Sequence, residues 1–412
     1  MESKHSPIQQ LPSGWEVKKL KDVFFINELS LPANTSADYQ FHYIPIEQVS
    51  TNHIDFDNCN SFRFDEAPGR ARRILRDNDI LISGVRPNLK SFAIFRKPNG
   101  NNWICSTGFF VLTAKNKGDN LISYYELLSE ICGSQFYNYV VGSNYPAIGD
   151  SDIRNIRLVL PTSEKEKAAI ANILSKVDEA IASVQSSIAA AERLKKSLMQ
   201  NLLTGKMKPD GTIRTPEEFY IDEKFGKVPV GWKVKKIGEV TENLDNYRKP
   251  IKSGDRNKIK GKYPYYGAAG IVDYINDYLF DGIYILFGED GENLISRKVP
   301  QAFIVKGKFW VNNHAHILRV YDGFDINLIV QILESKKYDS IVYGSAQPKI
   351  NKSDLCKVKI IIPVEVEEQK KISDPIIEVD KEIVKKRNMT NILERLKKSL
   401  MQNLLTGKVK TF

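Results

Sequence analysis

The chain has 412 residues, of which 42% are hydrophobic and 10% aromatic, which excludes a disordered protein and allows more than one core. Sixty Lys and Arg against fifty Asp and Glu give a net charge of +10, which permits a nucleic-acid partner without requiring one. Its four cysteines lie far apart, and no apolar run approaches the ~20 residues of a membrane span. We therefore expect a cytoplasmic protein with no disulfide framework, zinc pattern or contact with a membrane.

The first 161 residues are predicted to form a β-rich domain. It opens with LPSGWEVKKLKDV at 11–23. Residues 79–96 and 103–113 combine β-branched and aromatic residues with turn signals, which is typical of strands, and 121–140 has the composition of a short helix. Strands followed by a helix indicate an α+β domain.

Residues 162–206 are predicted to form a long helix of about 60 Å. Ser163 and Glu166 form a capping box, and Gly205 is a stop signal. Apolar residues recur with spacings of four and three over several heptads, which favours a coiled-coil seam over a globular helix. The seam consists of Ile170, Leu174, Val177, Ile181, Val184, Ile188, Leu198 and Leu202.

Residues 207–363 are predicted to hold a connector, polar and rich in Pro and Gly up to residue 231, and a second β-rich domain. Strand patterns occur at 282–290, 301–307 and 314–321, and a short helix is predicted at 326–344.

A second long helix is predicted within residues 364–412, where Pro375 should kink it or delay its start. Lys386, Thr390 and Lys397 are polar seam positions, which cost stability but fix register or mark where a partner docks. Its apolar seam consists of Ile372, Ile376, Val379, Ile383, Leu393, Leu400 and Leu404.

The two halves of the chain are related by duplication. ERLKKSLMQNLLTGK occurs at 192–206 and again, identical in all fifteen positions, at 394–408. The opening segment is repeated as VPVGWKVKKIGEV at 228–240, whereas the inserts 24–141 and 241–343 do not align with each other. A constant frame around diverged inserts predicts that the frame meets the same partner in both halves and the inserts meet different ones.

Each long helix is too long and too apolar on one face to be stable alone. Because a whole domain separates the two in sequence, we expect them to pack against each other in antiparallel orientation. A dimer formed through these helices is the alternative.

The sequence contains no recognisable catalytic motif. The two Thr-Gly-Lys triplets lack the other residues of a phosphate-binding loop, and the tetrapeptide of DNA methyltransferases is absent. Gly-Glu-Asp-Gly at 288–291 has no second acidic cluster and is expected to be a tight turn with solvated acids. His314 and His316 are too few for a metal site. We expect a non-catalytic chain that binds no metal or cofactor itself.

Basic residues concentrate in the two inserts. Nine Lys and Arg occur from Arg63 to Lys97, and seven occur within 246–262, next to several tyrosines. Solvated loops often carry such charge, but a cluster in each insert favours two faces that track phosphates. The predicted DNA-binding residues are Arg70, Arg72, Arg73, Arg86, Lys90, Arg248, Lys249, Lys252, Arg256, Lys258, Arg297 and Lys298.

Several short motifs occur in a fixed order along the chain. They are Pro12-x-Gly14-Trp15 and Pro229-x-Gly231-Trp232, the repeated fifteen residues, Gly344-Ser345-x-Gln347-Pro348 before Ser353-Asp354-Leu355, and Gly288-Glu289-Asp290-Gly291 with Asn313-His314-Ala315-His316. The first half departs from this pattern at Tyr145, where the second has Gln347. In this order the motifs resemble those of the specificity (S) subunits of type I restriction–modification systems, over essentially the full chain.

The resemblance implies two target-recognition domains, each reading one half of a bipartite site in double-stranded DNA. The two helices would be antiparallel constant regions that space these domains and dock methyltransferase (M) subunits, through which restriction (R) subunits join. S-adenosylmethionine, ATP and magnesium would then belong to those partners. The alternatives are an autonomous DNA nuclease or methyltransferase of unfamiliar motif and a coiled-coil scaffold.

Overall fold

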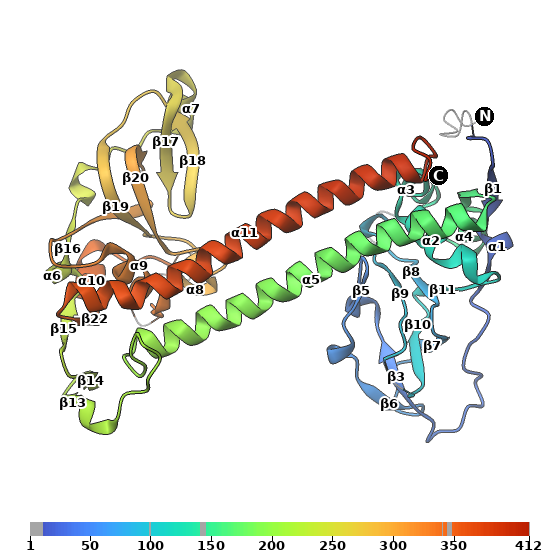
Figure 1. Cartoon of the computed structure of the whole chain (residues 1–412), viewed down its shortest axis with the longest axis horizontal. Helices are drawn as coiled ribbons and strands as arrows, with labels where there is room; N and C mark the ends of the chain where they lie inside the picture. The colour runs from blue at the N-terminus through green and yellow to red at the C-terminus, as the bar shows by residue number, and fades with distance from the viewer. Residues whose placement is uncertain (1–10, 99, 141–145, 340, 344–347, 412) are drawn as a thin grey trace. The chain divides into compact units, whose positions relative to one another are not determined.

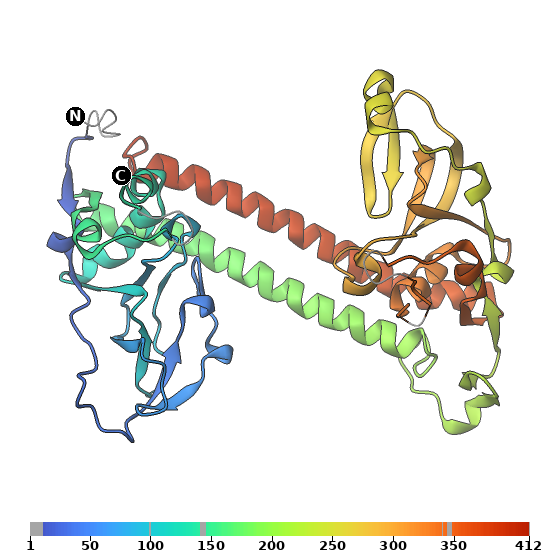
Figure 2. The ribbon, with the colours of Figure 1, turned by 180° about the vertical axis from the view of Figure 1, so that it is seen from behind.

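The chain folds into two compact units of mixed helix and strand, shown from opposite sides in Figures 1 and 2. The first unit comprises residues 1–184 and 389–412, and the second comprises residues 185–388. The computed structural model describes residues 11–98, 100–140, 146–339, 341–343 and 348–411.

The long helices are α5 (Glu164–Leu202) and α11 (Val366–Leu404). Helix α5 begins in the first unit and ends in the second, and α11 does the reverse. Helix α11 runs through Pro375, so the predicted delay of its start is wrong.

The strands of the first unit form two four-stranded sheets, in the orders β6-β3-β10-β7 and β2-β11-β8-β9, and the smaller pairs β1-β12 and β4-β5. The strands are β1 (Trp15–Lys19), β2 (Phe24–Ile26), β3 (Gln40–Ile44), β4 (Val49–Ser50), β5 (His53–Ile54), β6 (Ser61–Arg63), β7 (Ala71–Ile74), β8 (Ile80–Ser83), β9 (Phe92–Ile94), β10 (Trp103–Ser106), β11 (Phe109–Ala114) and β12 (Arg157–Pro161). The helices are α1 (Leu20–Val23), α2 (Lys117–Leu128), α3 (Glu130–Tyr139) and α4 (Asp150–Asn155).

The second unit contains a six-stranded sheet in the order β16-β21-β19-β20-β17-β18, with the pairs β13-β14 and β15-β22. Its strands are β13 (Phe219–Asp222), β14 (Gly226–Pro229), β15 (Trp232–Lys236), β16 (Thr241–Asn243), β17 (Lys260–Gly267), β18 (Gly270–Ile275), β19 (Phe280–Gly288), β20 (Ala302–Val311), β21 (Ala315–Val320) and β22 (Lys359–Pro363). Its helices are α6 (Ile237–Val240), α7 (Ser253–Arg256), α8 (Asn293–Ser296), α9 (Ile326–Ser335) and α10 (Lys352–Lys357).

Two helical segments differ from the sequence prediction. The helix expected at 121–140 is two helices, because Ser129 ends α2 and caps α3 by accepting a hydrogen bond from Cys132 N. The helix expected at 326–344 ends at Ser335. The connector also holds a hairpin, β13-β14, that was not predicted.

The long helices pair in antiparallel orientation within each unit, as predicted. In the first unit Lys397 Nζ lies 2.5 Å from Asp178 Oδ1, and in the second Lys195 Nζ lies 2.6 Å from Asp380 Oδ1. Lys195 and Lys397 occupy the same position of the repeat, and so do Asp178 and Asp380. The same Lys–Asp ion pair across the seam therefore occurs once in each unit, which explains why a lysine occupies a seam position in both helices.

The first turns of the two long helices are anchored by different chemistry at one repeat position. In α5, Lys167 Nζ lies 2.5 Å from Asp119 Oδ1, with both side chains less than a tenth exposed. At the equivalent position of α11, Gln369 Oε1 accepts a hydrogen bond from Asp325 N, and its Nε2 donates to Pro363 O. A buried ion pair in one unit thus corresponds to a neutral hydrogen-bonded amide in the other.

Each long helix ends on the opening motif of the other half. Gly407, after α11, lies against Pro12 and Trp15, and Gly205, after α5, lies against Pro229. Both glycines have a positive φ, of 63° and 69°, and a Cβ at either would collide with the proline ring. Glycine is therefore required at both ends by backbone and neighbour alike.

Glu126 of α2 is buried in the core of the first unit. Val159 N donates to its Oε1 at 3.4 Å, and Oε2 has no hydrogen-bond partner among the described residues. Burial raises the pKa of this carboxyl to about 8, only partly offset by the hydrogen bond from Val159. Glu126 is therefore protonated in the folded chain at neutral pH.

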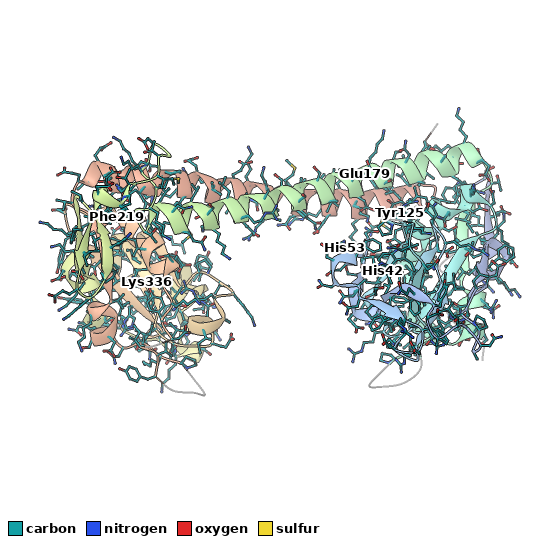
Figure 3. All side chains as sticks on the ribbon, turned by 90° about the horizontal axis from the view of Figure 1, so that it is seen from below. His42, His53, Tyr125, Glu179, Phe219 and Lys336 are labelled. Carbon is teal, nitrogen blue, oxygen red and sulfur yellow. The ribbon has the colours of Figure 1, made fainter. Side chains whose placement is uncertain are left out.

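Glu126→Gln is expected to make the free energy of unfolding of the first unit fall less steeply as pH rises. Because the folded state keeps a proton that an unfolded glutamate releases, the free energy of unfolding should fall between about pH 4.5 and 8, by roughly 1.4 kcal/mol per unit. Urea titrations across this range would measure the effect. Glu179→Gln, at an exposed position of α5 (Figure 3), should leave the slope unchanged. Equal slopes for Glu126→Gln and the wild-type chain would contradict the assignment.

Candidate nucleic-acid interface

The predicted basic residues of the first unit include three at β7, the end strand of its sheet. Arg70 is exposed. Arg72 lies over the ring of Phe64, with Cζ at 4.6 Å from the ring centre, and Arg73 donates a hydrogen bond of 2.9 Å to Ser30 Oγ. Arg72 and Arg73 therefore help to hold the strand, and Arg70 faces solvent.

Arg86 and Lys90 flank a 3-10 turn at Pro87–Leu89, and both have a left-handed backbone, with φ of 48° and 50°. Lys90 Nζ donates to Leu128 O at 2.5 Å, at the carbonyl end of α2, and burial lowers its pKa. Arg86 is exposed. Of the two, Arg86 is the better candidate for contact with DNA because it is the more exposed.

Two predicted residues of the second unit are held by acids or carbonyls within that unit. Arg256 Nε lies 3.1 Å from Asp273 Oδ2, and Arg297 Nη2 donates to Glu334 O at 2.6 Å. The remaining predicted lysines of this unit are exposed: Lys249, Lys252, Lys258 and Lys298.

A buried network of charged groups lies beside the end of β19. His316 Nδ1 lies 2.5 Å from Asp245 Oδ2, and its Nε2 lies 2.9 Å from Ile350 O, so both ring nitrogens face oxygen atoms. Glu289 Oε2 accepts from Arg248 at 2.5 Å, and its Oε1 lies 2.9 Å from Lys349 Nζ. The predicted residue Arg248 is therefore fixed beside Lys349, which the sequence did not single out.

The acids of this network are ionised although they are buried. Burial alone would raise the pKa of Asp245 and of Glu289. The hydrogen bonds from His316 to Asp245, and from Arg248 and Lys349 to Glu289, outweigh burial and hold both pKa values below their ordinary range. The prediction that both acids of Gly-Glu-Asp-Gly are solvated is wrong. Glu289 is 7% exposed and the side chain of Asp290 is 13% exposed, because their partners come from segments far away in sequence.

A similar backbone hydrogen bond occurs in each unit, just after an inner strand of a sheet. In the first, Arg86 N donates to Pro146 O at 2.7 Å, after β8. In the second, Gly291 N donates to Pro348 O at 2.9 Å, after β19. Pro146 and Pro348 are repeat equivalents, so Arg86 in the first unit corresponds to Gly291 in the second, next to the acids of the network. Four motif positions next to it, Tyr145, Gly344, Ser345 and Gln347, lie outside the described residues.

The predicted seam positions of the long helices are all buried or half-buried. Ile170, Leu174, Leu202, Ile372, Ile376, Ile383 and Leu404 are buried. The others are half-buried: Val177, Ile181, Val184, Ile188, Leu198, Val379, Leu393 and Leu400. Among exposed apolar side chains, Leu194 and Leu396 occupy one repeat position on both helices.

Two features are absent from the described part of the chain. None of its helices is long and apolar enough to cross a membrane. None of its described His, Cys, Asp and Glu side chains form a group of three or more that could hold a metal ion.

The duplicated arrangement of two α+β units with shared long helices defines a structural class with solved members. The crystal structure of the type I restriction–modification S subunit from M. genitalium matches with a TM-score of 0.63, covering 96% of this chain and 97% of that one at 15% identity. A chain from a structure of a type I R-M system assembly matches with a TM-score of 0.52, covering 97% and 100% at 20% identity. These likenesses show the fold.

A family model described as the type I restriction modification DNA specificity domain matches twice, at residues 12–193 and 229–394. The chain therefore belongs to this family and is a specificity subunit, not a catalytic one. Among curated relatives, the type I restriction enzyme MjaVIII specificity subunit of Methanocaldococcus jannaschii is 25% identical over 97% of this chain and 94% of its own length. The EcoprrI specificity subunit of Escherichia coli is 28% identical over 24% of each. The resemblance inferred from the motifs is confirmed.

Proposed function

We propose that the chain recognises a bipartite site in double-stranded DNA, with one half read by each β-rich domain, 1–161 and 207–363. The observation that carries this proposal is a duplicated frame around two inserts that do not align, each with its own basic cluster. Inserts that bind unlike half-sites have reason to diverge, whereas inserts that bind only phosphates do not.

The side chains that contact DNA are assigned from exposure and position. Arg70 and Arg86 in the first unit, and Lys249 and Lys252 in the second, are exposed and suited to phosphates or to guanine edges. Arg248, Arg256, Arg297 and Lys90 act mainly by positioning backbone, because their cationic groups already contact acids or carbonyls in their own units. Lys349 acts in the same way, because its ammonium is paired with Glu289 at 2.9 Å, although half of its side chain is exposed.

The long helices, 162–206 and 364–412, are proposed to space the two domains and to dock M subunits, through which R subunits join the assembly. The repeated fifteen residues support a partner common to both halves. S-adenosylmethionine, ATP and magnesium would be bound by these partners, in the cytoplasm. The seam residues serve helix pairing, which their burial supports.

Replacing residues 24–141 with the corresponding insert of another S subunit is expected to change one half of the methylated sequence only. The replaced segment holds the first unit's basic residues, and the second unit is untouched. Co-expression with the M subunit of the same system, followed by mapping of methylated sites, measures the outcome. The matched control is replacement of 241–343, which should change the other half. A change in both halves after either exchange would contradict the modular proposal.

A further inference from the structure

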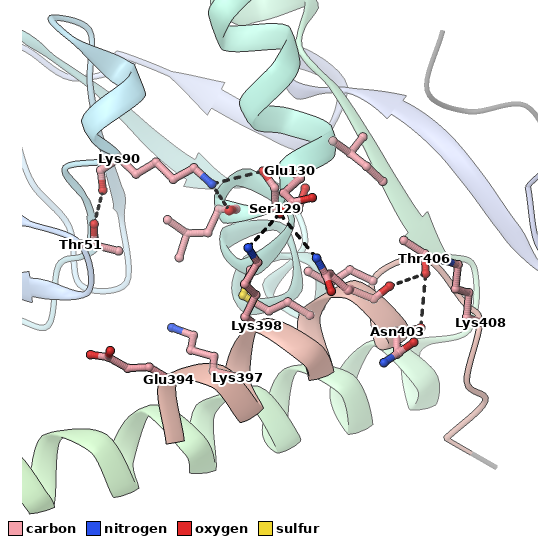
Figure 4. A pocket seen from close by; sticks show the side chains of 15 residues that line it. Thr51, Lys90, Ser129, Glu130, Glu394, Lys397, Lys398, Asn403, Thr406 and Lys408 are labelled. Atoms are coloured by element: carbon pink, nitrogen blue, oxygen red, sulfur yellow. Dashed lines mark hydrogen bonds and ion pairs between the residues drawn. The ribbon is translucent and has the colours of Figure 1, made fainter. Parts of the chain in front are cut away.

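Each unit contains a groove beside the end of the long helix that carries the repeated sequence. In the first unit, the last turns of α11 face the junction of α2 and α3, and the groove encloses about 690 Å³ (Figure 4). In the second, the last turns of α5 face the end of α9, and the groove encloses about 630 Å³. Two grooves of similar size thus occur at equivalent places.

The constant walls of the two grooves are identical. Seven positions of the repeated sequence line both. Among them are Lys196, Met199 and Gln200 in the second unit, which correspond to Lys398, Met401 and Gln402 in the first. The opposite walls differ, because most of their residues come from the diverged inserts.

Packing within the chain explains only part of this identity. The buried or half-buried seam positions differ between the helices, with Val184 and Ile188 in α5 against Lys386 and Thr390 in α11. By contrast, Lys196 and Lys398 are exposed, yet this repeat position is a lysine in both helices. Packed positions inside the repeated fifteen residues are also identical, but Lys196 and Lys398 are exposed and take no part in the seam, so their identity points to a molecule outside the chain.

The chemistry of the grooves indicates an acidic segment with an apolar side chain. Met199 and Met401 provide adaptable apolar contact surface. In the second unit Lys196, Lys336 and Lys337 line the groove, and Lys336 lies over the ring of Phe225, with Nζ at 5.6 Å from its centre.

The acids that line the grooves leave this positive charge in excess. In the second unit, Glu192 is already paired with Arg387, at 2.7 Å. In the first, Lys398 is 3.5 Å from Glu130, a loose and exposed pair that a partner's carboxylate can replace (Figure 4). Both grooves therefore favour carboxylates from a partner.

We propose that both grooves bind the same acidic, apolar-tipped segment of the M subunit, one copy in each groove. This proposal rests on the proposed function, which requires an M partner, and it adds the surface and the chemistry of docking. The identical wall supplies the common contacts, and the insert-derived wall completes each groove.

The test uses the full-length chain with Lys196→Glu, Lys398→Glu or both, and the purified M subunit of the same system. Each single variant should bind one M subunit with unchanged affinity and the second about 10- to 100-fold more weakly, because a repelling charge replaces an attracting one. The double variant should lose both. Native mass spectrometry gives the stoichiometry, and calorimetric titration gives the affinities. Thermal unfolding like that of the wild-type chain shows that these exposed positions leave the fold intact.

Matched controls are Lys176→Glu on α5 and Lys371→Glu on α11, both exposed and outside the grooves, which should keep full binding. Leu194→Asp with Leu396→Asp tests the rival surface, because these leucines are exposed and do not line the grooves. Loss of binding in this pair, with full binding by the lysine variants, would overturn the groove proposal alone. A wild-type chain that binds no M subunit would overturn the proposed function together with it.

Discussion

Lys167→Met is expected to lower the free energy of unfolding of the first unit by about 3–5 kcal/mol. The substitution leaves the carboxylate of Asp119 buried without the ammonium that lies 2.5 Å away. The other acid near Lys167, Glu164, is mostly exposed, so the loss falls on Asp119. Chemical unfolding followed by a probe in the first unit measures the change.

Two further variants separate charge from packing. Lys167→Met combined with Asp119→Leu removes both charges and should restore most of the lost stability, since replacing a whole buried pair by apolar groups is often neutral. Gln369→Met, at the equivalent position of α11, should cost only about 1–3 kcal/mol because it leaves neutral backbone groups unpaired. If both single substitutions cost the same, burial of charge is not what anchors α5.

Removing one heptad from each long helix, residues 185–191 and 384–390, is expected to abolish methylation of the original bipartite site. The two deleted segments face each other in the register given by the pairs Asp178–Lys397 and Lys195–Asp380, so the seam and both pairs are kept. Both helices run from one unit into the other, and each loses about 10 Å. At 3.4 Å per base pair this equals roughly three base pairs, so the recognised spacer should shorten by about three.

Sequencing of methylated sites in cells that express each variant would measure the spacer. Deleting residues 185–191 alone is the control, because it moves Lys195 one heptad away from Asp380 and should prevent stable pairing. An unchanged spacer in the double deletion would show that the helices do not determine half-site spacing.

Local and periodic features of the chain could be predicted from sequence. The ends of the long helices were found because heptads, a capping box and Gly205 are all local signals. The break at Ser129 was missed because a serine in a helical pattern is equally compatible with continuation. The hairpin β13-β14 was missed because its strands are short and lie in a polar segment.

The candidate site was predictable only in part, because its geometry depends on contacts that are distant in sequence. The basic clusters were visible, but which members face solvent depends on partners such as Asp273 and Glu289. Asp245 and Lys349 belong to no motif recognised in the sequence. One signal for the contacts between the helices was present in the sequence. Asp178 and Asp380 repeat at the same offset as Lys195 and Lys397, so pairing the two repeats predicts the ion pairs across the seam.

The contacts of Gly407 with Pro12 and of Gly205 with Pro229 give the molecule a cyclic order. The second opening motif contacts the end of α5, which precedes it in the chain. The first opening motif contacts the end of α11, which is the last helix of the chain. Neither half is structurally the first, and the order of the halves in the polypeptide carries no structural information. A half-length chain that pairs with a second copy of itself would make each of these contacts. Fusion of two such genes leaves the two inserts free to diverge while the contacts at the helix ends are kept.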